Sequence, residues 1–304
     1  MRDHFLRNIL FYIICYSILV VYQTIQMKWY FILFFFVMFL LIIVSYFVFR
    51  DKVTDSFQSN SSSPSVQFLT KKQFTQILLE NKDKYYETFN KNDLKVRNIK
   101  DIQDYSPIIK KSTCEGTSKL KSRIQSAIRK IEQKMRQMES NSILHGIVIR
   151  KWRQLPWKIG FTCDSQYEFG FPHTRNDIIV LNVADALSRS DHKLCKLLIH
   201  EKTHVYQKRY KHDMEKYFQS KGLRIVDTKT KKKQYIPANP DINSHVYDDL
   251  ETKFQYYAKY RKNPTTHHDI RFAKNHPKFE HPLEKIAYDM EDVMETKYQY
   301  NIKK

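Results

Sequence analysis

The chain has 304 residues, a formal net charge of +20 and 42% hydrophobic residues, which is enough apolar surface to build a core and excludes a disordered polyelectrolyte. Five glycines and nine prolines exclude collagen-like and low-complexity repeat proteins. The four cysteines are scattered, at positions 15, 114, 163 and 195, so we expect neither a disulfide scaffold nor a cysteine-ligated metal site, and a reducing compartment rather than an oxidising one.

Two long apolar runs lie near the N-terminus. Residues 29–49 contain no charged side chain, and a helix of this length spans roughly 30 Å, the thickness of a bilayer hydrocarbon core. The first run, residues 9–22, reaches a spanning length only when it is extended over residues 5–26, so it is a second span, an interfacial segment or a signal-like region. Residues 1–50 are therefore expected to form a membrane anchor of one or two transmembrane helices.

Cations around these runs predict the orientation of the anchor. Two arginines precede the first run, and Arg50 and Lys52 follow the second. The positive-inside rule then places the large domain on the cytosolic side of the membrane. Residues 51–65 are rich in serine and are interpreted as a flexible linker. No second linker follows, so residues 66–304 are expected to form one domain.

The apolar pattern of this domain predicts an α+β fold. Apolar residues recur at helical spacing over Lys119–Met138, above a basic outer face, and a second helix is expected near Lys71–Asn90. Short apolar runs predict strands at residues 177–182, 223–226 and 254–260.

The most informative segment is an HExxH motif, formed by His200, Glu201 and His204. The apolar pattern of residues 194–205 predicts a helix, with Asp191 as a cap at its start. On a helix, residues i and i+4 lie on one face with Cβ atoms about 5–6 Å apart, so the two imidazoles can bind one Zn²⁺. Glu201 then lies beside the metal and can act as general base, taking a proton from zinc-activated water.

A catalytic zinc needs a third protein ligand. The metzincin pattern is excluded, because Gln207 and Tyr210 stand where it requires glycine and histidine. His212 follows too late for that geometry and is expected to be a surface side chain. The alternative for the whole motif is a pair of histidines that matches by chance.

The better candidate for the third ligand lies in residues 280–291. Pro282 suits the first turn of a helix, and Glu284 and Glu291 then share a face of that helix. A carboxylate from a second helix can complete the histidine pair. We assign this role to Glu284, with Glu291 and Asp289 as the alternatives.

These segments also resemble known proteins. The helix LLIHEKTHVYQ, followed downstream by HPLEKIAYDME, resembles zinc metallopeptidases of the gluzincin group. HEKTHVYQ, with Phe171-Pro-His-Thr174 and Asn239-Pro-Asp241, is similar to uncharacterised membrane-anchored HExxH proteins of large DNA viruses. The resemblance covers roughly residues 160–295. It implies a zincin-like domain with an HExxH helix, a small sheet and a C-terminal ligand helix, a bound zinc, peptide hydrolysis, and a host or virion membrane as the location.

Other candidate residues are less specific. His173, His245 and Tyr247 are of the types that stabilise a tetrahedral intermediate, and each can equally be a packed ring. The segment 239–241 is interpreted as a turn, and the lysines of 229–233 as a solvated loop that is able to bind anionic lipid or nucleic acid.

The net charge indicates partners. A basic surface attracts phosphate groups, and for a domain tethered beside a membrane the expected partners are anionic lipid head groups. The sequence has no zinc finger, RNP motif or Gly-rich phosphate loop, so no dedicated nucleic-acid module is expected.

The sequence thus predicts a membrane-anchored, zinc-dependent metallopeptidase-like protein. The alternative is a non-catalytic membrane protein that uses a zincin-like fold as a structural or interaction module. A third hypothesis is a basic membrane-surface or nucleic-acid binder. The peptide or protein substrate is not specified by the sequence.

Overall fold

The structure is a computed structural model that describes residues 38–40, 65–138, 142–226, 236–243, 245–272 and 279–295. The residues from 65 onward belong to one compact unit, which begins at Ser63. No helix among the described residues is long and apolar enough to span a bilayer. The spans expected at 5–26 and 29–49 lie outside the described residues, apart from 38–40, and so does the linker at 51–65, apart from its last residue.

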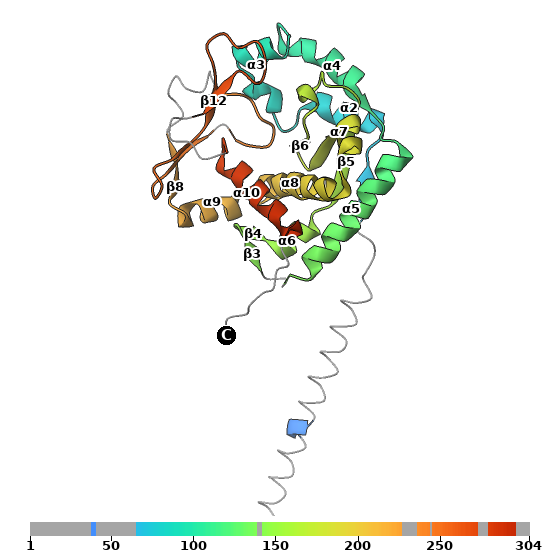
Figure 1. Ribbon diagram of the computed structural model, residues 1–304, viewed down its shortest axis with the longest axis vertical. Helices are drawn as coiled ribbons and strands as arrows, with labels where there is room; N and C mark the ends of the chain where they lie inside the picture. Colours follow the sequence, from blue (N-terminus) through green and yellow to red (C-terminus); the bar gives the residue numbers. More distant parts are fainter. Residues whose placement is uncertain are drawn as a thin grey trace, which may run out of the picture. The chain divides into compact units, whose positions relative to one another are not determined.

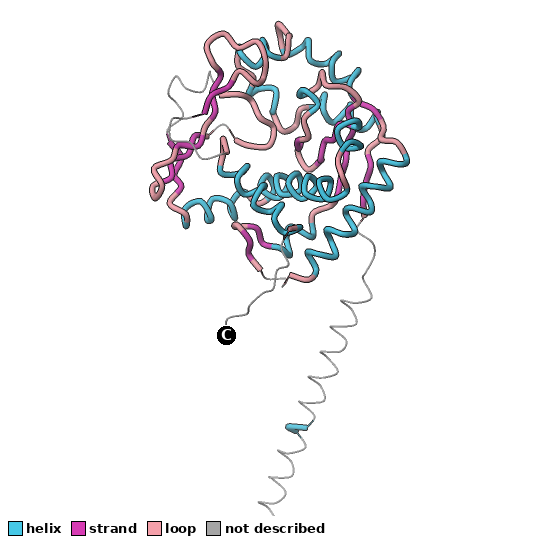
Figure 2. The backbone as a smooth tube through the Cα atoms, viewed as in Figure 1, coloured by secondary structure: helices cyan, strands magenta, loops and turns pink. Residues whose placement is uncertain are grey.

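The domain combines helices and strands (Figure 1, Figure 2), so the predicted α+β class is confirmed. The α-helices are α2 (Lys71–Glu80), α3 (Lys91–Val96), α4 (Tyr105–Ser112), α5 (Ser118–Arg136), α6 (Ile149–Gln154), α7 (Val183–Ser188), α8 (Asp191–Arg209), α9 (Lys211–Ser220) and α10 (Pro282–Glu291). Short 3-10 turns are η1 (Tyr85–Thr88), η2 (Ile102–Asp104), η3 (Glu168–Gly170) and η5 (Asp292–Met294). The strands are β1 (Val66–Phe68), β2 (Thr113–Cys114), β3 (Ile143–Leu144), β4 (Ile147–Val148), β5 (Trp157–Thr162), β6 (His173–Arg175), β7 (Ile178–Asn182), β8 (Leu223–Val226), β9 (Val246–Asp249), β10 (Gln255–Tyr256), β11 (Ala258–Tyr260) and β12 (Ile270–Phe272).

The main sheet has five strands in the order β1-β5-β7-β6, with β2 also paired to β5. β1, β5 and β7 are parallel, whereas β6 and β2 run antiparallel to their neighbours. Along β7, Ile179 and Leu181 pack into the same cluster as α5 and α8, and Ile178 and Val180 pack with α2 and α4. Both faces of β7 are therefore covered by helices, which explains why this strand is a continuous apolar run.

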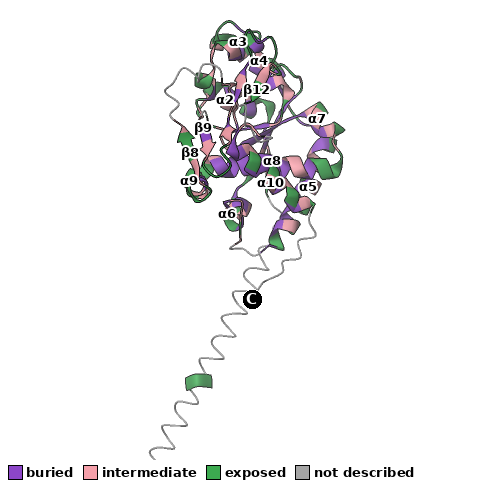
Figure 3. Cartoon of the chain, turned by 60° about the vertical axis from the view of Figure 1, so that its left-hand side comes forward, coloured by how far each residue is buried: buried purple, intermediate pink, exposed green. Residues whose placement is uncertain are grey.

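α8 lies in the middle of the domain and is buried over most of its length (Figure 3). It packs against α10, α5 and β7. The apolar side of α5, from Leu120 to Met135, is fully buried, as its helical spacing predicted. Because α8 is packed on several sides, the polar residues of the HExxH motif are enclosed by protein rather than spread on a surface.

Two expected elements differ from the structure. The helix expected near 71–90 ends at Glu80, because Asn81 adopts a left-handed conformation with φ of 45° and terminates it. The strand expected at 254–260 is split into β10 and β11, which pair with β9 and β12 respectively. The strands expected at 177–182 and 223–226 are β7 and β8.

Two cysteines form a single disulfide, which the scattered cysteine positions and the expected reducing compartment did not predict. Cys114 on β2 is bonded to Cys163, which follows β5, and their Cα atoms are 5.9 Å apart. The two residues are separated by 49 positions in the sequence and meet because β2 pairs antiparallel with β5. Cysteine spacing along the chain contains no information on such a pairing across a sheet. Cys195 is free and buried.

Candidate metal centre

The HExxH motif lies on α8, the buried helix that begins after Ser190. The Ser190 side chain accepts a hydrogen bond from the backbone N–H of Lys193 and caps the helix. Asp191, which the sequence indicated as the cap, is instead the first helical residue, where its charge complements the helix dipole. His200 and His204 follow one turn apart and are 9% and 0% exposed.

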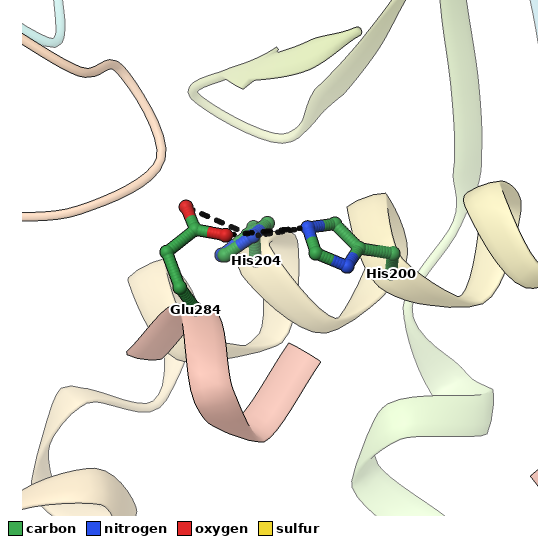
Figure 4. A group of neighbouring side chains, drawn as sticks. All are labelled: His200, His204 and Glu284. Atoms are coloured by element: carbon green, nitrogen blue, oxygen red, sulfur yellow. Dashed lines mark hydrogen bonds and ion pairs between the residues drawn. The ribbon is translucent and has the colours of Figure 1, made fainter. Parts of the chain in front are cut away.

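The two imidazoles and a carboxylate from α10 converge on one point (Figure 4). The Nε2 atoms of His200 and His204 are 3.1 Å apart. Glu284 Oε2 lies 3.5 Å from the first of these nitrogens, and Glu284 Oε1 lies 3.7 Å from the second. The structure therefore brings together the three residues that the sequence assigned as metal ligands.

Hydrogen bonds on the far side of each ring fix the tautomers. Nδ1 of His200 lies 3.0 Å from Glu291 Oε1, and Nδ1 of His204 lies 2.8 Å from Gln207 Oε1. Carboxylate and carbonyl oxygens accept, so each Nδ1 carries the proton and donates it. Gln207 is itself oriented by donating to the carbonyl of Leu283. Both Nε2 atoms are thus left to face Glu284, which is the arrangement of histidine metal ligands with an outer shell of acceptors.

The spacing of these donor atoms fits a small tetrahedral cation. Two ligands at about 2.0–2.1 Å from a tetrahedral Zn²⁺ are separated by about 3.3–3.4 Å. The 3.1 Å between the two nitrogens is close to that value, and each nitrogen has one oxygen of Glu284 at 3.5 or 3.7 Å. With one donor atom taken from each residue, all three lie within 4.8 Å of one another. A donor set of two imidazoles and one carboxylate is also a common catalytic zinc set.

The charges of these groups depend strongly on one another. Burial acts to lower the pKa of His200, but its hydrogen bonds to Glu284 and Glu291 raise that pKa well above its usual value. Burial acts to raise the pKa of Glu284, but the neighbouring His204 and His200 hold it well below its usual range. A proton is therefore held between imidazole and carboxylate, and a divalent cation bound at this point would displace it.

Glu201 faces the same region. The residue is 3% exposed, and its Oε2 atom has no hydrogen-bond partner among the described residues. Burial raises the pKa of Glu201 well above the usual value, and the nearby carboxylate of Asp241 raises it further. A buried carboxyl oxygen without a partner needs a ligand or a water molecule, which is the requirement of a general base.

His200, Glu201, Glu284 and Glu291 line one cleft of about 880 Å³. Its walls also include residues that the sequence did not identify as functional. Asn239 donates to Glu280 Oε1 at 2.9 Å and to the metal-ligand candidate Glu284 at 3.5 Å. Asp241 accepts from the backbone N–H of Thr174 on β6 at 2.7 Å. The segment expected to be a simple turn thus connects the edge strand to the ligand helix.

The other candidates separate clearly. Of the three proposed intermediate-stabilising residues, His173 lines the cleft and His245 and Tyr247 do not. Asp289 accepts from Lys285 at 2.6 Å on the outer side of α10, and His212 is an exposed side chain near Glu215, as expected. The lysines of 229–233 lie outside the described residues.

The chain matches no protein-family model, no curated protein and no solved structure. The function is therefore inferred from the geometry and chemistry of the site itself.

Proposed function

We propose that this protein is a zinc-dependent, metallopeptidase-like hydrolase with a zincin-like fold, attached to a host or virion membrane by residues 1–50. His200, His204 and Glu284 are the zinc ligands, and Glu201 is the general base. The observation that carries the proposal is the meeting of two Nε2 atoms and one carboxylate, with one donor atom from each residue within 4.8 Å of the others, beside a carboxyl oxygen that has no partner among the described residues.

Each residue has a defined task in amide hydrolysis. Bound zinc would supply a Lewis acid that lowers the pKa of water and polarises a carbonyl. Glu201 takes a proton from the attacking water and passes it to the leaving nitrogen as the carbon–nitrogen bond breaks. Burial raises the pKa of Glu201 above that of an ordinary carboxyl, which makes it a stronger base toward the attacking water.

The rival proposal is that the same metal centre is structural, in a non-catalytic interaction module. A closed structural zinc has four protein ligands, whereas a catalytic one keeps a position open. The described residues contain three such ligands grouped together, and the group opens onto a cleft. Both features favour the enzyme.

The experiment that tests the proposal compares zinc content with peptide cleavage in the purified full chain. Glu201→Gln should keep its zinc, measured by elemental mass spectrometry, and lose cleavage of a mixed peptide library by a factor of about 10²–10⁴. Glu284→Ala should lose both zinc and cleavage, because it removes a ligand.

His212→Ala provides the matched control, because this exposed histidine follows α8 but lies outside the ligand group. It should retain both zinc and activity. Full cleavage by Glu201→Gln would contradict the hydrolase proposal. Zinc binding by the wild-type chain without any cleavage would favour the structural module. Binding to anionic surfaces that falls steeply with salt and ignores the histidines would support the basic binder instead.

A further inference from the structure

One wall of the cleft is a short turn with strained backbone. In η3, which precedes the edge strand β6, three successive residues have positive φ: Glu168 at 44°, Phe169 at 57° and Gly170 at 74°. Non-glycine residues, and bulky ones such as phenylalanine above all, rarely adopt this conformation. It persists where the surrounding structure enforces it, commonly at ligand-binding sites.

The enforcing contacts are made by Glu168. This side chain is 5% exposed, and its carboxylate accepts hydrogen bonds from Arg97 Nη2 at 2.6 Å, Tyr105 Oη at 2.6 Å and Tyr85 Oη at 2.9 Å. Charge-assisted bonds of this kind are strong. The turn is therefore held rigidly, with the rings of Phe169 and Phe171 fixed at the cleft.

These two phenylalanines and His267 form a cluster, which we call the aromatic subsite. The ring centroids of Phe169 and His267 are 4.1 Å apart and stacked, and those of Phe171 and His267 are 5.0 Å apart and perpendicular. The guanidinium of Arg97 lies 5.3 Å from the Phe169 ring. Phe171 remains 51% exposed, so its ring is the part of the subsite that is open to a ligand.

Two nitrogen atoms beside these rings have no hydrogen-bond partner among the described residues. They are Nε2 of His267 and Nε2 of His173, both buried. His173 is 2% exposed, and its Nδ1 must donate to the carbonyl of Phe171, 2.9 Å away. In the neutral ring Nε2 is then an acceptor. Buried polar atoms are rarely left unpaired in the functional state, so a ligand with an N–H group fits here.

The subsite is close to the proposed metal centre. His200, Glu201 and all the residues of the subsite line the same cleft. The Lys208 ammonium on α8, one turn beyond His204, donates to the carbonyl of Thr174, the residue after His173. The edge strand thus lies against the helix that carries the HExxH motif.

We propose that the aromatic subsite binds an aromatic side chain of a peptide, and that Nε2 of His173 accepts a hydrogen bond from the N–H of that peptide's main chain. Aromatic rings pair favourably in stacked and perpendicular geometries. The proposal adds a substrate class to the proposed function. Binding at the subsite does not itself require zinc, so the two can be tested separately.

The experiment measures binding of capped pentapeptides Ac-Gly-Ala-Xaa-Ala-Gly-amide to the metal-free full chain in detergent, with Xaa as Phe, Ala or Lys. The Phe peptide should bind at least about tenfold more tightly than the Ala peptide, because a ring is buried, and the Lys peptide should bind no more tightly than the Ala peptide. Phe171→Ala should remove this preference. His267→Phe should keep it, because ring contacts remain.

Ile143→Ala is the matched control, because Ile143 is a 69% exposed apolar residue that does not line the cleft. It should leave the preference unchanged. Equal binding of the Phe and Ala peptides, or a preference that survives Phe171→Ala, would overturn the subsite. Zinc-dependent cleavage without aromatic preference would support the proposed hydrolase and contradict the aromatic subsite. Aromatic preference without zinc binding would support the aromatic subsite and contradict the proposed hydrolase.

Discussion

Glu291 and Asp289 are two residues apart on α10 and have different surroundings. Glu291 Oε1 accepts from Nδ1 of His200 at 3.0 Å, and its other oxygen lies 3.6 Å from Lys196. Asp289 accepts from Lys285 at 2.6 Å. Glu291 therefore orients a metal-ligand candidate without facing the metal position, and Asp289 does neither.

This difference predicts unequal effects on zinc affinity. Glu291→Ala should weaken zinc binding by about 10–100-fold, because the ring of His200 loses the acceptor that fixes its tautomer. Asp289→Ala should leave the affinity unchanged. Competition with a fluorescent zinc chelator measures both. Equal affinities in the two variants would show that the contact between Glu291 and His200 does not support the metal site.

Some residues of the site could be predicted from the sequence, and others could not. His200 and His204 were predictable because helical geometry alone sets their separation. The choice of Glu284 over Asp289 and Glu291 depends on how α10 rotates against α8, which no spacing along the chain encodes. Asp241 lies on a segment without regular structure, so no periodicity could have identified it as a neighbour of Glu201.

Lys202, between the two histidines of the motif, shows what α8 contacts on its opposite side. Its ammonium is fully buried, lies 3.2 Å from Glu132 of α5, and is 4.3 and 4.0 Å from the ring centroids of Trp152 and Trp157. Trp157 also donates to Glu132 at 3.0 Å. A charged pair enclosed by two indole rings thus fixes α8 against α5.

We predict that a double-mutant cycle will show coupling between Lys202 and Glu132. Lys202→Met should destabilise the domain by up to about 3–5 kcal/mol at pH 7, because the buried Glu132 loses its closest cation and keeps only Arg153, 3.8 Å away. Lys202→Met combined with Glu132→Gln should recover most of that loss. Thermal unfolding followed by tryptophan fluorescence measures the cycle. Additive losses in the double variant would mean that the two side chains do not interact.

The same lysine predicts a dependence on pH. Burial lowers the pKa of Lys202 to about 8, whereas in the unfolded chain it stays near about 10.4. Between these values the unfolded state binds more protons, so stability rises with pH at up to about 1.4 kcal/mol per unit. The free energy of unfolding of the wild type, minus that of Lys202→Met, should therefore increase from pH 8 to 10. Thermal unfolding at each pH measures this difference. If this difference in free energy does not change with pH, the lysine is solvated rather than buried.

At the scale of elements, local signals succeeded where packing agreed with them. α5, α8 and β7 follow from apolar patterning, and α10 follows from Pro282 in its first turn. The early end of α2 at Asn81 and the division of β10 from β11 at Tyr257 depend on turns and pairing partners. Tertiary contacts decide where these helices and strands end, and the pattern of a single sequence does not report those contacts.

At the scale of the whole molecule, two features predict different compartments for the domain. The cations at Arg50 and Lys52 predict a cytosolic domain. The Cys114–Cys163 disulfide is typical of oxidising compartments. The sequence could not reveal this conflict, because a disulfide closed across the sheet has no signature in cysteine spacing. The redox state of the pair therefore bears on location as well as on stability.

The disulfide predicts a loss of stability on reduction. It closes a loop of 49 residues, and the chain-entropy model gives about 4 kcal/mol for a loop of that length, or roughly 10 °C in melting temperature for a domain of this size. Thermal scans of the full chain with and without reductant should show this shift, and Cys114→Ser with Cys163→Ser should melt like the reduced protein. Cys195→Ser, at the buried free cysteine, is the matched control and should keep the response to reductant.

Blocking thiols in intact cells before lysis tests the redox state of the pair where it forms. If the two cysteines stay unblocked because they are bonded, the domain lies in an oxidising compartment. If both are blocked, it lies on the cytosolic side that the flanking cations predict.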